Sequence, residues 1–161
     1  MIFIPYNVPS SKNSKNPFLM GKGKNQRIVL TPSKTVKKYL QLIGVKKYRS
    51  SLSKKQVENG VQKVEEYATR PNLFRESVGN YFKDIKYPAE IGFHFVRDTK
   101  RKFDFHNAVQ IIADLLVAHE CIEDDDMTHF IPVAFSMSGC WFSLDKEDPG
   151  VFIKILDNQS K

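Results

Sequence analysis

The sequence predicts a single α+β domain, residues 1–161, in which a small mixed sheet is flanked by helices. Segments 89–96 and 128–135 are rich in apolar and aromatic residues, as strands are. Between them, residues 108–119 carry Val, Ile and Leu at the spacing of a helix with a broad apolar face. The chain is 41% hydrophobic and 12% aromatic, which favours a globular protein with one buried core.

The elements before this unit follow from composition. Residues 1–5 fit a short strand, and residues 7–27 predict a loop because Asn, Ser, Lys, Gly and Pro dominate them. Residues 26–30 fit a second strand. Pro32 in a first turn then predicts an amphipathic helix over residues 34–48.

We expect residues 50–86 to be an inserted helical segment of the same domain. Ser53 and Gln56 form a partial capping box at the start of one helix, which continues to about residue 68. A shorter helix is expected over residues 72–82. Two further strands are expected around residues 141–144 and over residues 151–156.

Several features indicate a soluble, cytoplasmic protein. Cys121 and Cys140 form no metal-binding pattern and require no disulfide. The chain has no apolar run long enough to cross a bilayer, and residues 1–5 are too short for a signal peptide.

Charge is distributed very unevenly along the chain. Residues 1–57 hold 13 Lys or Arg and no Asp or Glu, although the whole chain has a net charge of only +7. This asymmetry indicates a polyanionic partner, with a solubilising tail or an ordinary amphipathic surface helix as the alternatives. The candidate DNA-binding residues are Lys12, Lys15, Lys22, Lys24, Arg27, Lys34, Lys37 and Lys38, together with Lys100, Arg101 and Lys102 of a second basic segment.

Acidic residues stand at both ends of the central helix. Asp104 precedes it, and Glu123, Asp124, Asp125 and Asp126 follow it. If the acidic loop folds back, or begins a strand beside the strand that ends near Asp104, these carboxylates gather and favour a hard divalent ion. The alternatives are that Asp104 only caps the helix and that the acidic run is a solvated turn.

These residues form a spaced motif. The chain has Asp104-Phe-His106-Asn107, then Gln110, Asp114-Leu-Leu, and Asp124-Asp125, with 21 positions between Asp104 and Asp125. The motif resembles that of the RusA-like Holliday junction resolvases of phages and prophages, in which D-x-D-N is followed by K, D-A-L and D-D. The opening Ile-Pro strand and basic Ser-Asn loop are also similar, so the resemblance covers residues 1–20 and 88–157.

The resemblance implies a metal-dependent, structure-selective DNA endonuclease that acts as a homodimer on branched DNA. Asp104, Asp124 and Asp125 then correspond to Mg²⁺ ligands. His106 stands where the family has its second Asp, and Gln110 where it has its Lys. An imidazole ligand suits Mn²⁺ better than Mg²⁺, and Gln110 can bond a phosphate without supplying charge.

These two substitutions leave a second hypothesis open: a branched-nucleic-acid-binding protein on the same fold with weak or no catalysis. A third is a structural interaction protein whose acidic loop has no chemical role.

Overall fold

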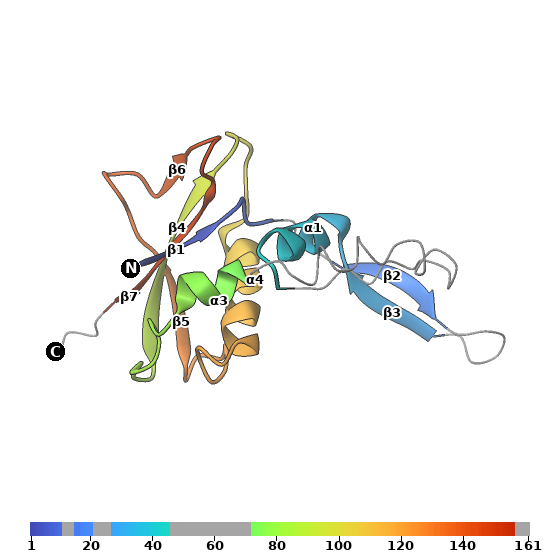
Figure 1. Ribbon diagram of the computed structural model, residues 1–161, viewed down its shortest axis with the longest axis horizontal. Helices are drawn as coiled ribbons and strands as arrows, with labels where there is room; N and C mark the ends of the chain where they lie inside the picture. Colours follow the sequence, from blue (N-terminus) through green and yellow to red (C-terminus); the bar gives the residue numbers. More distant parts are fainter. Residues whose placement is uncertain (11–14, 21–26, 46–71, 157–161) are drawn as a thin grey trace.

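The computed structural model describes residues 1–10, 15–20, 27–45 and 72–156 (Figure 1). Its main sheet has five strands: β1 (Ile2–Pro5), β7 (Gly150–Leu156), β4 (Ala89–Arg97), β5 (Phe130–Ala134) and β6 (Phe142–Leu144). β1, β7 and β4 are antiparallel neighbours, whereas β5 and β6 both run parallel to β4. The sheet is therefore mixed, as the sequence predicted.

β5 and β6 share one edge of β4. β5 pairs with residues 89–93 and β6 with residues 95–97, which leaves His94 at the gap between the two short strands. The His94 ring is fully buried, with Nδ1 3.1 Å from the Phe135 carbonyl oxygen and Nε2 2.7 Å from Ser143 Oγ. A carbonyl only accepts, so Nδ1 donates to it. His94 thus bonds the end of β5 to the middle of β6.

The central helix, α4 (Phe105–Ala118), connects β4 to β5 and supplies much of the core. Its buried residues include Ile112 and Leu116, which belong to one cluster with Phe93 and Phe95 of β4. Phe93 also meets Phe130 of β5 edge to face, with ring centroids 6.0 Å apart. Side chains of the helix and the sheet therefore form one continuous core.

Two shorter helices complete the described core. α1 (Lys34–Leu42) buries Val36, Tyr39 and Leu40, and α3 (Leu73–Val78) buries Phe74 and Val78. Ser33 caps α1 by accepting the backbone N–H of Val36. The described part of the predicted 34–48 helix thus ends at Leu42, and the 72–82 helix shortens to six residues followed by turns.

One prediction of local structure is wrong. Residues 7–27 were expected to be a loop, but β2 (Lys15–Met20) pairs antiparallel with β3 (Arg27–Pro32) in a separate two-stranded sheet. This hairpin extends away from the main sheet beyond α1 (Figure 1). Composition predicts turns well but does not reveal strand pairing, because the cross-strand partner supplies the hydrogen bonds.

The mixed α+β architecture is confirmed. The expected helix from Ser53 to about residue 68 lies outside the described residues, so half of the insertion and the single-domain assignment stay predictions. In the described part of the chain, no helix combines the length and the apolar character needed to cross a membrane.

Candidate nucleic-acid interface

Asp104 lies at the start of α4 and acts as its N-cap. Its Oδ1 accepts the backbone N–H of Asn107 at 3.3 Å, and its backbone is extended rather than helical. A carboxylate here also interacts favourably with the positive end of the helix dipole. The capping alternative considered for Asp104 is therefore observed.

Asp124 and Asp125 lie at the opposite end of the unit. Because β5 runs parallel to β4, the acidic loop leads into β5 beside Ala89, where β4 begins, whereas Asp104 follows the end of β4. The 14 residues of α4 separate the two loops, a rise of about 21 Å. Within one chain the carboxylates of Asp104 and Asp125 therefore lie apart, since a parallel crossover places its two loops at opposite ends of the strands that it joins.

The other motif residues do not complete a metal site. His106 and Gln110 are exposed and one turn apart on α4, far from the acidic loop. Throughout the described ranges, no three His, Cys, Asp or Glu side chains form a group that could hold a metal ion. The predicted ligands Asp104, His106, Asp124 and Asp125 therefore do not fit a shared Mg²⁺ or Mn²⁺ ion within one chain.

The acidic loop is organised by its own hydrogen bonds. Asp126 Oδ1 accepts bonds from the Thr128 N–H (2.7 Å), the Thr128 hydroxyl (2.6 Å) and His129 Nδ1 (3.0 Å), and these bonds lower the pKa of Asp126 to about 2. His129 Nε2 also lies 3.4 Å from Glu123. The hydrogen bond to Asp126 is the main reason that the pKa of His129 is raised. Asp126, which the motif does not use, is thus the residue that shapes this loop.

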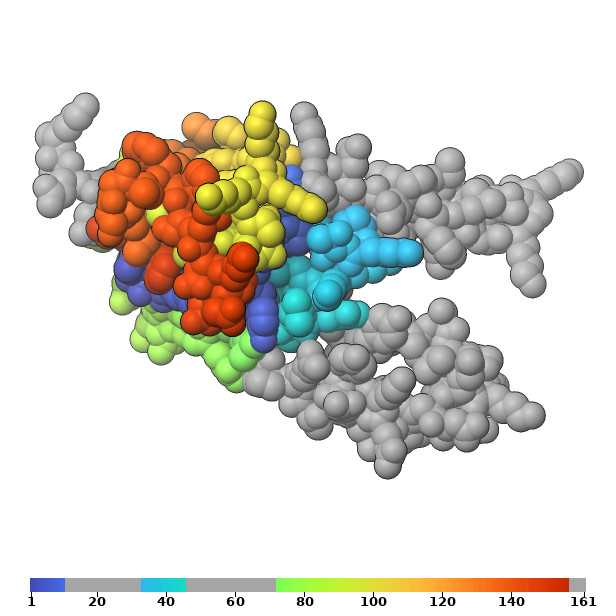
Figure 2. Space-filling view, turned by 90° about the horizontal axis from the view of Figure 1, so that it is seen from above, coloured from blue at the N-terminus to red at the C-terminus, as the bar shows by residue number. Residues whose placement is uncertain are grey.

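Only some of the predicted DNA-binding residues have side chains that the structure describes. Lys34, Lys37 and Lys38 of α1 are exposed, as are Lys100, Arg101 and Lys102 in the loop between β4 and α4. Figure 2 shows the start of α1, the yellow 97–104 loop and the orange region of β6 and β7 on one face. The backbones of Lys15 and Arg27 lie on β2 and β3, and the remaining predicted positions lie outside the described residues: Lys12, Lys22 and Lys24.

Two exposed aromatic residues, Trp141 and Phe142, lie at the start of β6, and the Phe142 ring contacts the basic loop. Trp141 and Phe142 are 64% and 45% exposed and adjacent in the chain. The Phe142 ring meets Phe103 edge to face at 5.7 Å, and Phe103 belongs to the same loop as Arg101 and Lys102. Aromatic rings beside basic side chains are the combination that holds unpaired bases and their phosphates.

A pocket of about 330 Å³ lies within the basic face. Its walls come from the segment after β1, the start of α1 and the 97–102 loop. Arg97 lines it and is only 7% exposed, which is unusual for an arginine. The sequence pointed to the exposed neighbours of Arg97 and not to Arg97 itself, because a strand-end arginine gives no sign of burial.

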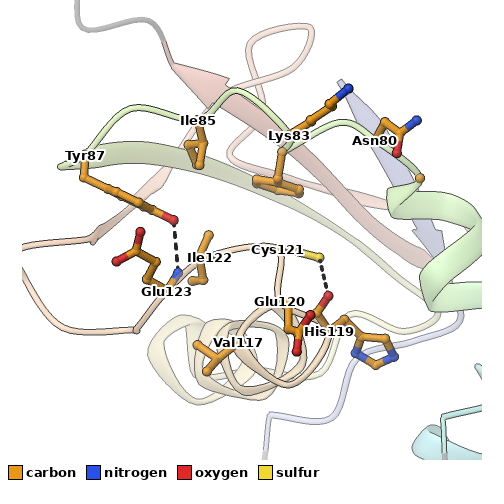
Figure 3. A pocket seen from close by; sticks show the side chains of 12 residues that line it. Asn80, Lys83, Ile85, Tyr87, Val117, His119, Glu120, Cys121, Ile122 and Glu123 are labelled. Carbon is orange, nitrogen blue, oxygen red and sulfur yellow. Dashed lines mark hydrogen bonds between the residues drawn. The ribbon is translucent and has the colours of Figure 1, made fainter.

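A second hollow lies between the turns after α3 and the end of α4. Its volume is about 660 Å³, and its lining includes Lys83, Tyr87, Cys121 and Glu123 (Figure 3). The Tyr87 hydroxyl accepts the backbone N–H of Glu123 at 3.0 Å, which ties the acidic loop to this wall. Burial raises the pKa of the Cys121 thiol, so it is a poor nucleophile at neutral pH.

Comparisons with known proteins add no assignment: no family model, no curated protein and no solved structure matches the chain.

Proposed function

We propose that this protein binds nucleic acid through the face formed by α1, the 97–102 loop and β6. The observation that carries the proposal is that two segments with exposed basic side chains, α1 and the 97–102 loop, meet at one pocket. Both segments contribute to that pocket, α1 through Thr35 and the loop through Arg101 and Lys102. A cluster of Lys and Arg binds phosphates by releasing their counterions, with little dependence on sequence. The exposed basic side chains of the two segments are Lys34, Lys37, Lys38, Lys100, Arg101 and Lys102.

Branched DNA is the proposed partner. The motif resemblance to Holliday junction resolvases supports this choice, and so do the exposed rings of Trp141 and Phe142. Bases at a branch point or in a single strand present faces on which such rings can stack, whereas duplex bases are already stacked. The Phe103 ring of the basic loop contacts the Phe142 ring.

Trp141 makes the test direct because it is the only tryptophan in the chain. Its fluorescence is measured while the protein is titrated with a four-way junction, and with duplex arms of the same sequences. We expect quenching and tighter binding with the junction. Equal affinity for both DNAs would remove the branched-DNA proposal, and no binding to either would remove the nucleic-acid proposal.

Metal-dependent cleavage of the junction, by a homodimer, is the second candidate function. The motif favours it, because 21 positions separate Asp104 from Asp125 as in the family it resembles. Within one chain these residues lie at opposite ends of α4, so ligands for one ion would have to come from two copies of the chain. Two-fold symmetry permits the start of α4 in one copy to meet the acidic loop of the other.

Cleavage is tested on labelled junction DNA with Mg²⁺ or Mn²⁺, using Asp104→Asn and Asp125→Asn proteins alone and mixed. We expect each variant alone to be inactive and the mixture to recover part of the activity, since mixed dimers retain one intact pair of ends. His106→Asp with Gln110→Lys should increase cleavage in Mg²⁺. If neither the wild type nor this double variant cleaves the junction, the cleavage proposal fails and nucleic-acid binding remains the proposed function.

A further inference from the structure

The pocket beside Arg97 contains an unpaired buried donor. Arg97 Nη1 donates to the Val8 carbonyl oxygen at 2.6 Å, and its guanidinium carbon lies 4.8 Å from the centroid of the Phe103 ring. These two contacts fix the plane of the side chain. Arg97 Nε is buried, and no described residue accepts its hydrogen.

Such a donor is uncommon in a folded protein. Most buried polar groups have a partner, and leaving one unpaired is unfavourable. A guanidinium has five N–H donors in a fixed fork, which matches the oxygens of phosphate and carboxylate. Between them, the described residues accept only one of the five Arg97 donors. Arg97 therefore has the capacity to bind an anion in the pocket that it lines.

The charges around the pocket favour an anion despite one carboxylate. Arg97, Arg101 and Lys102 contribute three positive charges, and Asp98 one negative charge, which gives +2. Asp98 already accepts a bond from Asn7 Nδ2 at 2.6 Å. Burial lowers the pKa of Arg97 and Asp98 raises it, but an arginine remains charged at neutral pH. The Asp98 carboxylate is thus already bonded to Asn7, and the pocket retains an excess of positive charge.

We propose that this pocket binds one backbone phosphodiester of the nucleic acid, with Arg97 as its buried anchor and Arg101 and Lys102 as its exposed clamp. The inference rests on the proposed nucleic-acid binding and gives it a defined contact. Lys102 is two residues before Asp104, so the bound phosphate lies beside the start of α4. One strand of the DNA would then cross the surface between α1 and β6.

The first experiment measures the pocket itself. The Arg97 Nε–H resonance is followed by NMR while wild-type protein is titrated with a dinucleoside monophosphate, and separately with inorganic phosphate. We expect the dinucleoside monophosphate to shift this resonance. A shift with inorganic phosphate alone would overturn the backbone assignment, and no shift with either ligand would overturn the site.

The second experiment measures junction affinity in matched variants. Arg101→Gln with Lys102→Gln should weaken binding about tenfold more than the control, Lys83→Gln with Lys86→Gln, which removes the same charge from exposed positions elsewhere. Asp98→Asn preserves an oxygen for Asn7 and should tighten binding severalfold.

If the two double variants lose junction affinity equally, the proposed phosphate pocket is refuted, although nucleic-acid binding stands. Weaker junction binding by Asp98→Asn would refute the pocket in the same way. If the wild type binds no junction, the proposed function fails. The dinucleoside titration then still decides whether the pocket takes a phosphodiester.

Discussion

Salt dependence gives the most quantitative test of the basic face. Each phosphate neutralised in duplex DNA contributes about −0.9 to the slope of log K against log salt concentration. The six exposed basic side chains of α1 and the 97–102 loop therefore predict a slope of about −5. Contacts made by basic residues beyond the described ranges would make the slope steeper.

The perturbation is Lys37→Gln with Lys38→Gln. Both side chains are exposed on α1, while the core contacts of the helix come from Val36, Tyr39 and Leu40. Removing two of six contacts should reduce the magnitude of the slope by about 2. The change in slope is a better measure than the slope itself, because it does not depend on the total number of contacts.

The assay is fluorescence titration with the junction at several salt concentrations between about 0.05 and 0.2 M, where phosphate contacts dominate the variation in affinity. Lys83→Gln with Lys86→Gln is the matched control, and its slope should equal that of the wild type. If both double variants change the slope equally, net charge and not the α1 surface governs binding. A wild-type slope near zero would refute the polyanion interpretation.

Three further predictions concern other parts of the molecule. Asp104→Ala should lower the free energy of unfolding by about 1 kcal/mol, because the cap of α4 is lost. Asp104→Asn should lower it much less, and thermal unfolding measures both variants. The pKa of His129, measured by NMR titration, should exceed 6.5 and should fall in Asp126→Asn. The ion pair of His129 with Asp126 therefore stabilises the fold below pH 6.5, and this stabilisation is lost as the pH rises through the pKa of the folded state. Trp141→Ala should weaken junction binding by about 1–3 kcal/mol and duplex binding by much less in a mobility-shift assay.

Periodicity was sufficient to predict the elements that form the core. The apolar spacing of Ile112 and Leu116 places them on one side of α4, where they are buried, and the terminal strand over residues 151–156 is observed as β7. These predictions succeed because burial of one face is recorded locally in the sequence. The predicted strand over residues 26–30 is observed as β3, but β2 and its pairing were missed because the partners lie 7 to 17 positions apart.

The arrangement of the acidic residues could not be predicted, because it depends on strand direction. The sequence places Asp104 and Asp125 on either side of a helix, and the parallel pairing of β5 with β4 keeps the two loops at opposite ends of these strands. Arg97 was missed for a related reason. Its contacts come from Val8 and Phe103, which belong to different segments of the chain.

β5 and β6 pair with different parts of the same edge of β4, so the connection between them can change independently of the sheet. β5 and β6 are each held in register by their own pairs with β4, and His94 joins the boundary between them. The connecting tip, at Gly139, has a positive φ of 79°, and open space surrounds it. Gly139 itself is constrained by its positive φ, but neither strand pairs through this tip, so residues added there need not shift the register of β5 or β6. An insertion at this tip, two positions before Trp141, would change the surface next to the exposed indole while the sheet stays the same.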